Sequence, residues 1–151
     1  MATKIDVMRQ IVIDLATIFP TLTAQQQIYL TPKIMTVTSM GPLELQVCEG
    51  AVEYGPQDGS CRDEDFIVQI GIFRKYRLDS GKRHAKALTD LKLSLFAQKA
   101  PVITLLNGSF LTGDLLDRPL IIRTESAITE PEQGQLLKIL NFTAGLNVSM
   151  L

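Results

Sequence analysis

The chain has 151 residues and a formal net charge of −1 at pH 7, with 46% hydrophobic and 21% charged residues. This length and balance are typical of one globular domain with a sizeable core, and they exclude a largely disordered chain. The near-neutral charge argues against general nucleic-acid binding, and no run approaches the roughly 18 apolar residues of a membrane span. We therefore expect a single domain over residues 1–151, with no membrane partner.

The first third of the chain predicts a helix followed by strands. Apolar residues recur at helical spacing over residues 4–19, and Pro20 ends that helix. Residues 21–31 are polar and predict a loop or a short helical turn. Residues 33–39 are β-prone, and residues 43–48 alternate apolar and polar side chains, as in a half-buried strand. A Gly-Pro turn signal between the last two segments indicates a hairpin.

The middle of the chain predicts a long loop, a strand and a second helix. Residues from about 49 to 64 are rich in glycine and acidic side chains, which predicts a long, exposed acidic loop. The alternation over residues 65–77 predicts the strongest strand of the chain. A buried stripe at helical spacing then predicts a helix over residues 82–99, which Pro101 ends.

The last third of the chain predicts two strands, at residues 118–128 and 135–144, joined by a turn at residues 130–134. Apolar residues on both faces of the final strand imply that it is buried in the fold or upon assembly. Sequential strands joined by short turns favour antiparallel pairing. We therefore predict an α+β fold, with a mostly antiparallel sheet of four to five strands and two main helices packed on one face.

The charge of the chain is split into two regions of opposite sign. Seven acidic residues and one basic residue lie between Glu44 and Asp65, whereas eight basic and two acidic residues lie between Arg74 and Lys99. Such regions can attract copies of the chain head to tail. The basic run is also consistent with a solubilising surface, or with DNA contacts that ignore sequence. The residues that we expect at a subunit or partner interface are Glu53, Asp58, Asp63, Glu64, Asp65, Arg74, Lys75, Arg77, Lys82, Arg83 and Lys86.

No grouping of residues predicts catalysis, a metal or a cofactor. The single histidine, His84, lies on the apolar stripe of the second helix, which is more typical of a core residue than of a base. The acidic triplet at residues 63–65 lacks the ligand spacing of a calcium loop. The chain has no glycine-rich phosphate loop and no GxSxG elbow, and Cys48 and Cys61 have no nearby histidine. We therefore expect a protein that is not an enzyme.

The order of these elements resembles the tail terminator (tail-tube completion) proteins of long-tailed bacteriophages. The resemblance covers about residues 4 to 146. It rests on an N-terminal helix, on β-strands, and on a strong strand at residues 66–72 that runs directly into a helix around residues 83–96. A strand opened by Asp-Arg-Pro-Leu at residues 117–120 and a final strand near residues 136–142 follow. The resemblance implies a hexameric ring that caps the tail tube, ends its polymerisation and joins it to the neck.

This resemblance implies a structural virion protein at the neck-proximal end of the tail, made in the host cytoplasm. The implied partners are other copies of the chain, the tail tube protein, a neck or head-completion protein, and DNA that passes through the ring without sequence specificity. One alternative is a small-molecule-binding or enzymatic α+β domain of unknown substrate. It requires a pocket with convergent polar groups, for which the chain offers only His84, Asp63, Asp65 and Tyr54. Another alternative is a bacterial interaction domain with no viral role.

Overall fold

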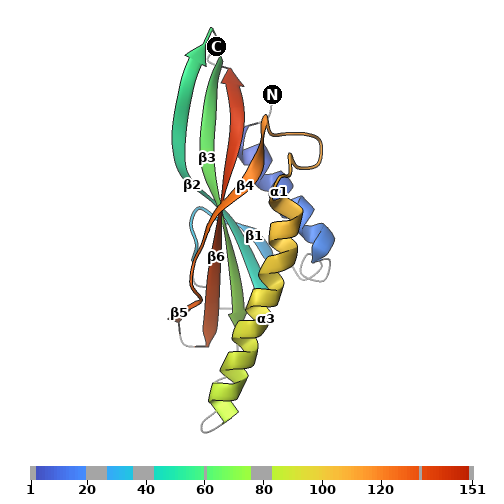
Figure 1. Ribbon diagram of the computed structural model, residues 1–151, viewed down its shortest axis with the longest axis vertical. Coiled ribbons are helices and arrows are strands. Elements are labelled where there is room, and N and C mark those ends of the chain that lie inside the picture. The colour runs from blue at the N-terminus through green and yellow to red at the C-terminus, as the bar shows by residue number, and fades with distance from the viewer. Residues whose placement is uncertain are drawn as a thin grey trace.

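The computed structural model of the protein describes residues 3–19, 27–35, 43–59, 61–75, 83–132 and 134–149. They form a long, twisted sheet with two helices beside it (Figure 1). The elements, in chain order, are α1 (Lys4–Ile18), β1 (Ile28–Leu30), β2 (Leu43–Asp58), β3 (Cys61–Lys75), α3 (Arg83–Leu106), β4 (Arg118–Glu125), β5 (Thr129–Glu132) and β6 (Gln135–Ser149). The expected α+β class is confirmed.

The sheet differs from the predicted one in strand number and direction. Its order is β1-β2-β3-β6-β4, and β5 pairs with β6 further along the edge that β4 occupies. β1 runs parallel to β2, whereas the other pairs are antiparallel. The prediction of four to five mostly antiparallel strands was wrong, because the described residues form a mixed sheet of six strands. The two strands that it missed, β1 and β5, have only three and four residues, too few to show a periodic pattern.

The predicted acidic loop at residues 49–64 is a long β-hairpin. β2 and β3 are 16 and 15 residues long, and only residues 59–60 connect them. Two bulges interrupt their register, one at Gly50 and Ala51 and the other at Gly55 and Pro56. A bulge adds a residue to one strand and shifts its inward and outward positions. Because of these bulges and the Gly and Pro residues at them, this part of β2 does not show the strict alternation from which a strand is predicted.

α1 begins with a capping box that the sequence contains in full. The backbone N–H of Asp6 donates to Thr3 Oγ1 at 3.3 Å, and the backbone N–H of Thr3 donates to Asp6 Oδ2 at 2.9 Å. The helix predicted at residues 4–19 is confirmed, since α1 covers all but the last of these residues. Its buried stripe includes Ile11 and Leu15, both fully buried.

α3 continues past the proline that was expected to end it. Pro101 lies inside the helix, which runs on to Leu106. A proline in a helix interior removes one backbone hydrogen bond and favours a break or kink at the preceding residue. Here the following turn carries Val102 and Leu106, both fully buried in the core. The burial of this apolar turn offsets the lost hydrogen bond, so the helix does not stop at residue 99.

The remaining strand predictions are correct in their centres and inexact at their ends. The strands expected at residues 65–77, 118–128 and 135–144 correspond to β3, β4 and β6. β6 extends five residues further than predicted, to Ser149, and β5 occupies part of the expected 130–134 turn. Of the hairpin predicted from residues 33–39 and 43–48, the second segment is strand, residues 33–35 are not, and residues 36–42 lie outside the described residues.

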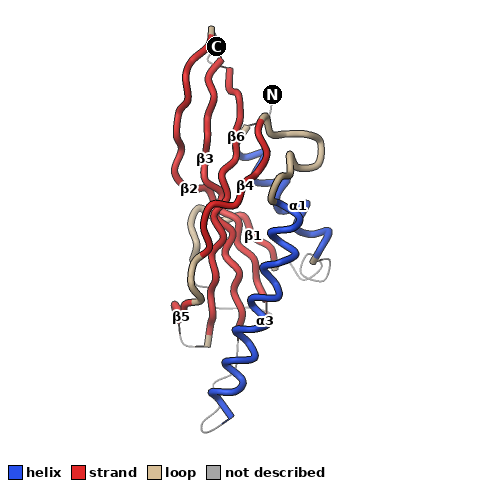
Figure 2. The backbone as a smooth tube through the Cα atoms, in the orientation of Figure 1, coloured by secondary structure: helices blue, strands red, loops and turns tan. Residues whose placement is uncertain are grey.

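The sheet has two faces, which we call the helical face and the far face. On the helical face, α1 and α3 lie beside the sheet (Figure 2). Their buried apolar side chains form one core with those of β2, β3 and β6. The paired positions of β3 and β6, Phe66 with Ala144 and Val68 with Phe142, point into this core. Alternate residues of the same strands form the far face, on which the described residues place no helix.

Part of the far face is covered by the segment that follows β1. Gln46 on β2 donates from Nε2 to the Met35 carbonyl at 2.8 Å and accepts from the Met35 backbone N–H at 2.9 Å. Ile34 lies directly on Gly71, where a Cβ would come within 2.8 Å of the Ile34 Cδ1 atom. Because Gly71 has no side chain, this segment can lie close against the sheet.

Glu44 is buried beneath the same region and is only partly hydrogen-bonded. It is 1% exposed, and its Oε2 accepts from Gln46 Nε2 at 2.9 Å, whereas its Oε1 has no hydrogen-bond partner among the described residues. Burial raises the pKa of Glu44 above its usual value. The carboxylate form of this side chain therefore weakens the folded state.

Replacing Glu44 by glutamine is expected to stabilise the protein near pH 8, by roughly 1 kcal/mol. Because folding raises the pKa of this carboxyl, its stabilising contribution is fully present below the unfolded pKa and is lost as pH rises through the folded pKa. The advantage of Glu44→Gln should therefore shrink toward about pH 4. Urea unfolding of the wild type and of Glu44→Gln between about pH 4 and pH 8 measures this difference in stability. A difference that does not change with pH would show that ionisation of Glu44 is not its cause.

Candidate assembly surface

The outer ends of β2, β3 and β6 extend past the ends of both helices as a three-stranded arm (Figure 1). We define the arm as residues 54–58, 61–64 and 146–149. Cys61 pairs with Asp58 on one side and with Ser149 on the other, so the three strands reach the same level. At about 3.3 Å per residue, five residues of β2 correspond to roughly 16 Å. The arm is thus a narrow projection that ends in the β2–β3 turn.

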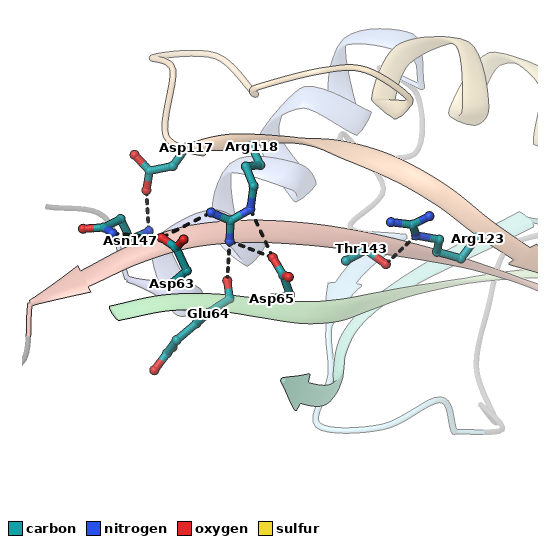
Figure 3. A network of polar contacts seen from close by, with 8 residues as sticks. All are labelled: Asp63, Glu64, Asp65, Asp117, Arg118, Arg123, Thr143 and Asn147. Atoms are coloured by element: carbon teal, nitrogen blue, oxygen red, sulfur yellow. Dashed lines mark hydrogen bonds and ion pairs between the residues drawn. The ribbon is translucent and has the colours of Figure 1, made fainter. Parts of the chain in front are cut away.

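A network of charged side chains on the far face ties three strands together at the base of the arm (Figure 3). Arg118, the first residue of β4, donates from Nη2 to Asp65 Oδ1 at 2.7 Å and to the Glu64 carbonyl at 3.3 Å. Its Nη1 lies 3.3 Å from Asp63 Oδ1. Because β6 lies between β4 and β3, the guanidinium reaches across that strand to bind the third one.

Gly145 on β6 makes this crossing possible. It pairs with Arg118 on one side and with Asp65 on the other, so it lies directly under the guanidinium. A Cβ at this position would come within 2.6 Å of Arg118 Nη2 and would collide with Nε as well. Any side chain at residue 145 therefore forces the arginine to leave the two carboxylates.

Asp63 is held ionised by its neighbours. Asn147 donates from Nδ2 to Asp63 Oδ1 at 2.9 Å, and this bond, followed by the charge of Arg118, lowers the pKa of the carboxyl. The backbone N–H of Asn147 in turn donates to the Asp117 carboxylate. The base of the arm is therefore fixed to the loop before β4 as well as to β4 itself.

Gly145→Ala is expected to lower the melting temperature by a few degrees, with no added effect when Arg118 is also replaced by methionine. Both changes remove the same contacts, and these contacts are half-exposed, so each single effect is modest. Thermal unfolding of the two single variants and the double variant measures the coupling. If the losses of the two single variants add in the double variant, Gly145 stabilises the protein in some way other than by making room for the Arg118 side chain.

The acidic residues predicted at the interface occupy different environments. Asp63 and Asp65 come together on the far face, where both are bound to Arg118. Glu64 lies on the opposite face, is buried, and accepts from Arg62 Nη2 at 3.0 Å. Glu53 and Asp58 lie on β2, Asp58 at its very end, and their side chains are outside the described part of the structure. The position of Asp58 next to the turn places it at the tip of the arm.

Of the basic residues predicted at the interface, four lie at the opposite end of the molecule, on the end of β3 and the start of α3 (Figure 1). Arg74 and Lys75 are the last residues of β3 and are half-buried. Arg83 and Lys86 lie in the first turns of α3, with side chains outside the described residues. Residues 76–82, which include Arg77 and Lys82, are also outside the description. The end of the acidic region, with Asp58, thus lies at the tip of the arm, whereas Arg74 and Lys75 lie at the far end of β3, where Glu44 of the acidic region also lies.

A second charged cluster, which the sequence did not predict, joins α3 to the sheet. Lys138 on β6 has a side chain only 4% exposed, and its Nζ donates to the Ser126 carbonyl at 2.8 Å. Glu125 lies 3.5 Å from Lys138 Nζ and accepts from Lys99 Nζ of α3 at 2.7 Å. The Lys99 bond, above all, lowers the pKa of Glu125. This cluster is structural, since it fastens the helix over a lysine that the fold buries.

Two hollows of about 410 Å³ each lie at the surface of the described residues. One lies between α1, the end of β1 and the first bulge of β2, where Lys4 and Glu49 form an ion pair of 3.4 Å. The other lies on the far face and is lined by Gly50, Ile67, Gln69, Arg123, Thr124, Asn141 and Phe142. Asp63 and Asp65 line neither of these hollows; both are bound to Arg118.

The described residues contain no group of three or more His, Cys, Asp and Glu side chains that could hold a metal ion. Cys48 is buried and Cys61 is half-buried, and both are free thiols. They face Gln69 and Asp58 in the hairpin register, so they do not lie opposite each other. In the described part of the chain, neither helix has the length and hydropathy needed to span a membrane.

No protein-family model matches the chain, and no curated protein matches it. Function must therefore be inferred from the residues, their contacts and the arrangement of charge.

Proposed function

We propose that the protein is a structural subunit of a long-tailed bacteriophage tail, a tail terminator. In this proposal six copies form a ring that caps the tail tube, ends its polymerisation and joins it to the neck, while DNA passes through without sequence-specific contacts. The order of elements from α1 to β6 supports it, because a strong strand followed by a helix and then by further strands, here β4, β5 and β6, is the feature that resembles that family.

The observation that carries the proposal is the separation of charge along an elongated subunit. The arm at one end carries Asp58, Asp63 and Glu64 beside Arg62, and the end of β3 and the start of α3, which carry Arg74, Lys75, Arg83 and Lys86, lie at the other end (Figure 1). A subunit with unlike ends favours heterologous contacts, which close into a ring when each step includes the right rotation. In the ring, the arm contacts the neighbouring subunit, and the basic end contacts a neighbour, the neck or the DNA backbone.

One observation favours the alternative of a small-molecule-binding domain. The hollow on the far face combines an apolar wall with the polar side chains of Gln69, Arg123 and Asn141, which is the kind of lining that ligand sites use. This alternative predicts a monomer whose melting temperature rises by several degrees with one ligand from a metabolite screen. The tail proposal predicts no such ligand.

The test of the proposal is the effect of the purified protein on tail tubes. Tube protein that polymerises alone should give tubes of many lengths, and addition of this protein should stop growth and leave a ring at one end in negative-stain images. A variant with Arg83→Glu and Lys86→Glu tests whether the basic end takes part. Tubes that grow unchanged in the presence of the folded wild-type protein would contradict the proposed role.

A further inference from the structure

The two long edges of the sheet differ in how their backbone groups are bound. The loop after α3 closes the middle of the β4 edge. The backbone N–H of Leu120 donates to the Ser109 carbonyl at 2.9 Å, and the Leu120 carbonyl accepts from the backbone N–H of Gly108 at 2.6 Å. The backbone N–H of Ile122 donates to Asn107 Oδ1 at 3.0 Å. This edge is therefore blocked to a further strand.

The opposite edge, formed by β2, is covered only at its start. β1 pairs with residues 45–47, and beyond that pairing the backbone N–H of Thr31 donates to the Val47 carbonyl at 3.0 Å. Pro32 follows, and the chain then leaves this edge to lie against the far face. Further along, no strand among the described residues pairs with this side of β2. We call residues 49–54 of β2 the open edge.

The backbone of the open edge directs hydrogen-bonding groups away from the sheet. Leu45 donates its N–H outward to the Gln27 carbonyl at 2.9 Å, and it lies opposite an even-numbered residue of β3. Along an antiparallel pair, alternate residues direct their backbone groups to the same side. Glu49 and Val52 also lie opposite even-numbered residues of β3, which pairs with β6 without a bulge. Both residues therefore direct their N–H and C=O groups outward, where the described strands provide no partner.

A hollow lies beside the open edge, at the point where β1 stops. This hollow of about 410 Å³ is lined by Ile5, Met8, Leu30, Thr31, Pro32, Glu49 and Gly50. Most of these side chains are apolar, and those of Ile5 and Leu30 are partly exposed. A strand added along the open edge continues the line of β1, so one of its side chains can enter the hollow. Backbone bonds to a sheet edge and a pocket for a side chain are the two parts of recognition by strand addition.

The charge of the open edge favours a basic occupant over a second copy of the chain. Residues 49–58 of β2 contain three acidic residues and no basic one, so the open edges of two copies would bring strands of like charge together. Within the described residues, the other edges of a second copy are also unsuitable, since β4 is blocked and β5 contains Pro131 and two glutamates. Glu49 already accepts one ammonium group, that of Lys4 at 3.4 Å. A basic segment is therefore the complementary occupant.

We propose that the open edge receives an extended, basic segment of a partner protein. The segment adds a strand beside β2, exchanges backbone hydrogen bonds with Glu49 and Val52, and places an apolar side chain in the hollow beside Ile5. This inference rests on the proposed function, under which the segment belongs to the tube or neck protein that the ring joins.

Synthetic heptapeptides test the contact with the full chain. Lysine and threonine alternate in them around a central valine, leucine, isoleucine or phenylalanine, and fluorescence anisotropy measures their binding. We expect methylation of one alternate set of backbone nitrogens to weaken binding by about tenfold or more, and methylation of the other set to change it by less than about threefold. Glutamate in place of every lysine should also weaken binding by about tenfold or more. Equal effects of the two methylated sets, or no binding by any of the four peptides, would overturn the proposal.

Two matched variants test the hollow. Ile5 and Ile13 are 46% and 57% exposed on α1, but only Ile5 lines the hollow. Ile5→Gln is expected to weaken binding of the tightest peptide by about threefold or more, and Ile13→Gln should leave it unchanged. Equal effects of the two variants would show that the hollow does not hold the peptide.

Val52→Pro tests the edge from the side of the protein. It removes an outward N–H and no hydrogen bond to β3, so it should weaken binding by about tenfold. Circular dichroism verifies that the variant is folded, and the methylated peptides test the same bonds without a change in the protein. A folded Val52→Pro variant that binds as tightly as the wild type would overturn the contact at this residue.

The outcomes separate this inference from the proposed function. A wild-type protein that stops tube growth but binds none of the peptides overturns the edge contact and leaves the proposed function intact. A protein that binds the peptides with the expected methylation pattern but leaves tube growth unchanged overturns the proposed function alone. A ring that the folded Val52→Pro variant no longer forms would assign the open edge to a second copy and overturn the partner segment.

Discussion

Phe66→Ala is expected to destabilise the protein by about 3–5 kcal/mol, the range for truncation of a buried aromatic side chain. Phe66 is fully buried where the arm joins the body of the sheet, and it pairs with Val52 on β2 and Ala144 on β6. No neighbouring segment can easily fill the cavity, because the two flanking strands hold it open. The melting temperature should fall by roughly 10 °C, measured by calorimetry.

Phe110→Ala is the matched control for this change. Phe110 is 42% exposed, so the same truncation should alter stability by no more than about 0.5 kcal/mol. A Phe66 variant as stable as the Phe110 variant would mean that the base of the arm is not part of the core.

Glu125→Ala is expected to lower the free energy of unfolding by about 2 kcal/mol. Lys138→Met is expected to lower it by less. Removal of Glu125 takes the carboxylate away from a lysine that is almost completely buried, and from Lys99 as well. Lys138→Met removes the buried charge itself and leaves Glu125 bound to Lys99. The loss of stability in Glu125→Ala should be smaller than for a fully buried ion pair, because the Glu125 side chain is one-third exposed. Urea unfolding of the two variants measures which of them is less stable.

The effect of Glu125 should also depend on pH. Folding lowers the pKa of this carboxyl, so its contribution is present above the unfolded pKa, which is near 4.5, and is lost as pH falls through the folded pKa. The stability difference between wild type and Glu125→Gln should therefore be largest near neutral pH and shrink below about pH 4. A difference that grows on acidification would contradict this assignment.

The sequence predicted the elements whose patterns are long and uninterrupted. The helical spacing from Ile5 to Phe19 and the alternation from Phe66 to Ile72 were enough to find α1 and β3. The bulges at Gly50 and Gly55 hid the outer half of β2, because each bulge shifts the inward positions along the strand. The predicted end of α3 at Pro101 was wrong, because the helix is continued by the burial of the turn that follows the proline. Such burial is a tertiary effect, which local helix propensity does not include.

The surface was predicted less well than the fold. The sequence gives the sign of each charge region but not which charges neutralise one another, and Asp63 and Asp65 prove to be partners of Arg118. That pairing depends on Gly145, which is far from both in sequence. The buried Lys138 could have been predicted from the sequence, since it interrupts the apolar row of β6 between Leu136 and Leu140. Arg123 gave none, because its hollow exists only once four strands are assembled.

The measurement that tests the central claim most directly is the native mass of the purified protein by light scattering over a dilution series. The proposed hexameric ring, held by heterologous contacts between charged surfaces, predicts one discrete species with the mass of six chains, which persists on dilution and dissociates as salt is raised. A monomer at every concentration, or a mass that rises without limit as in an open filament, would contradict a closed ring.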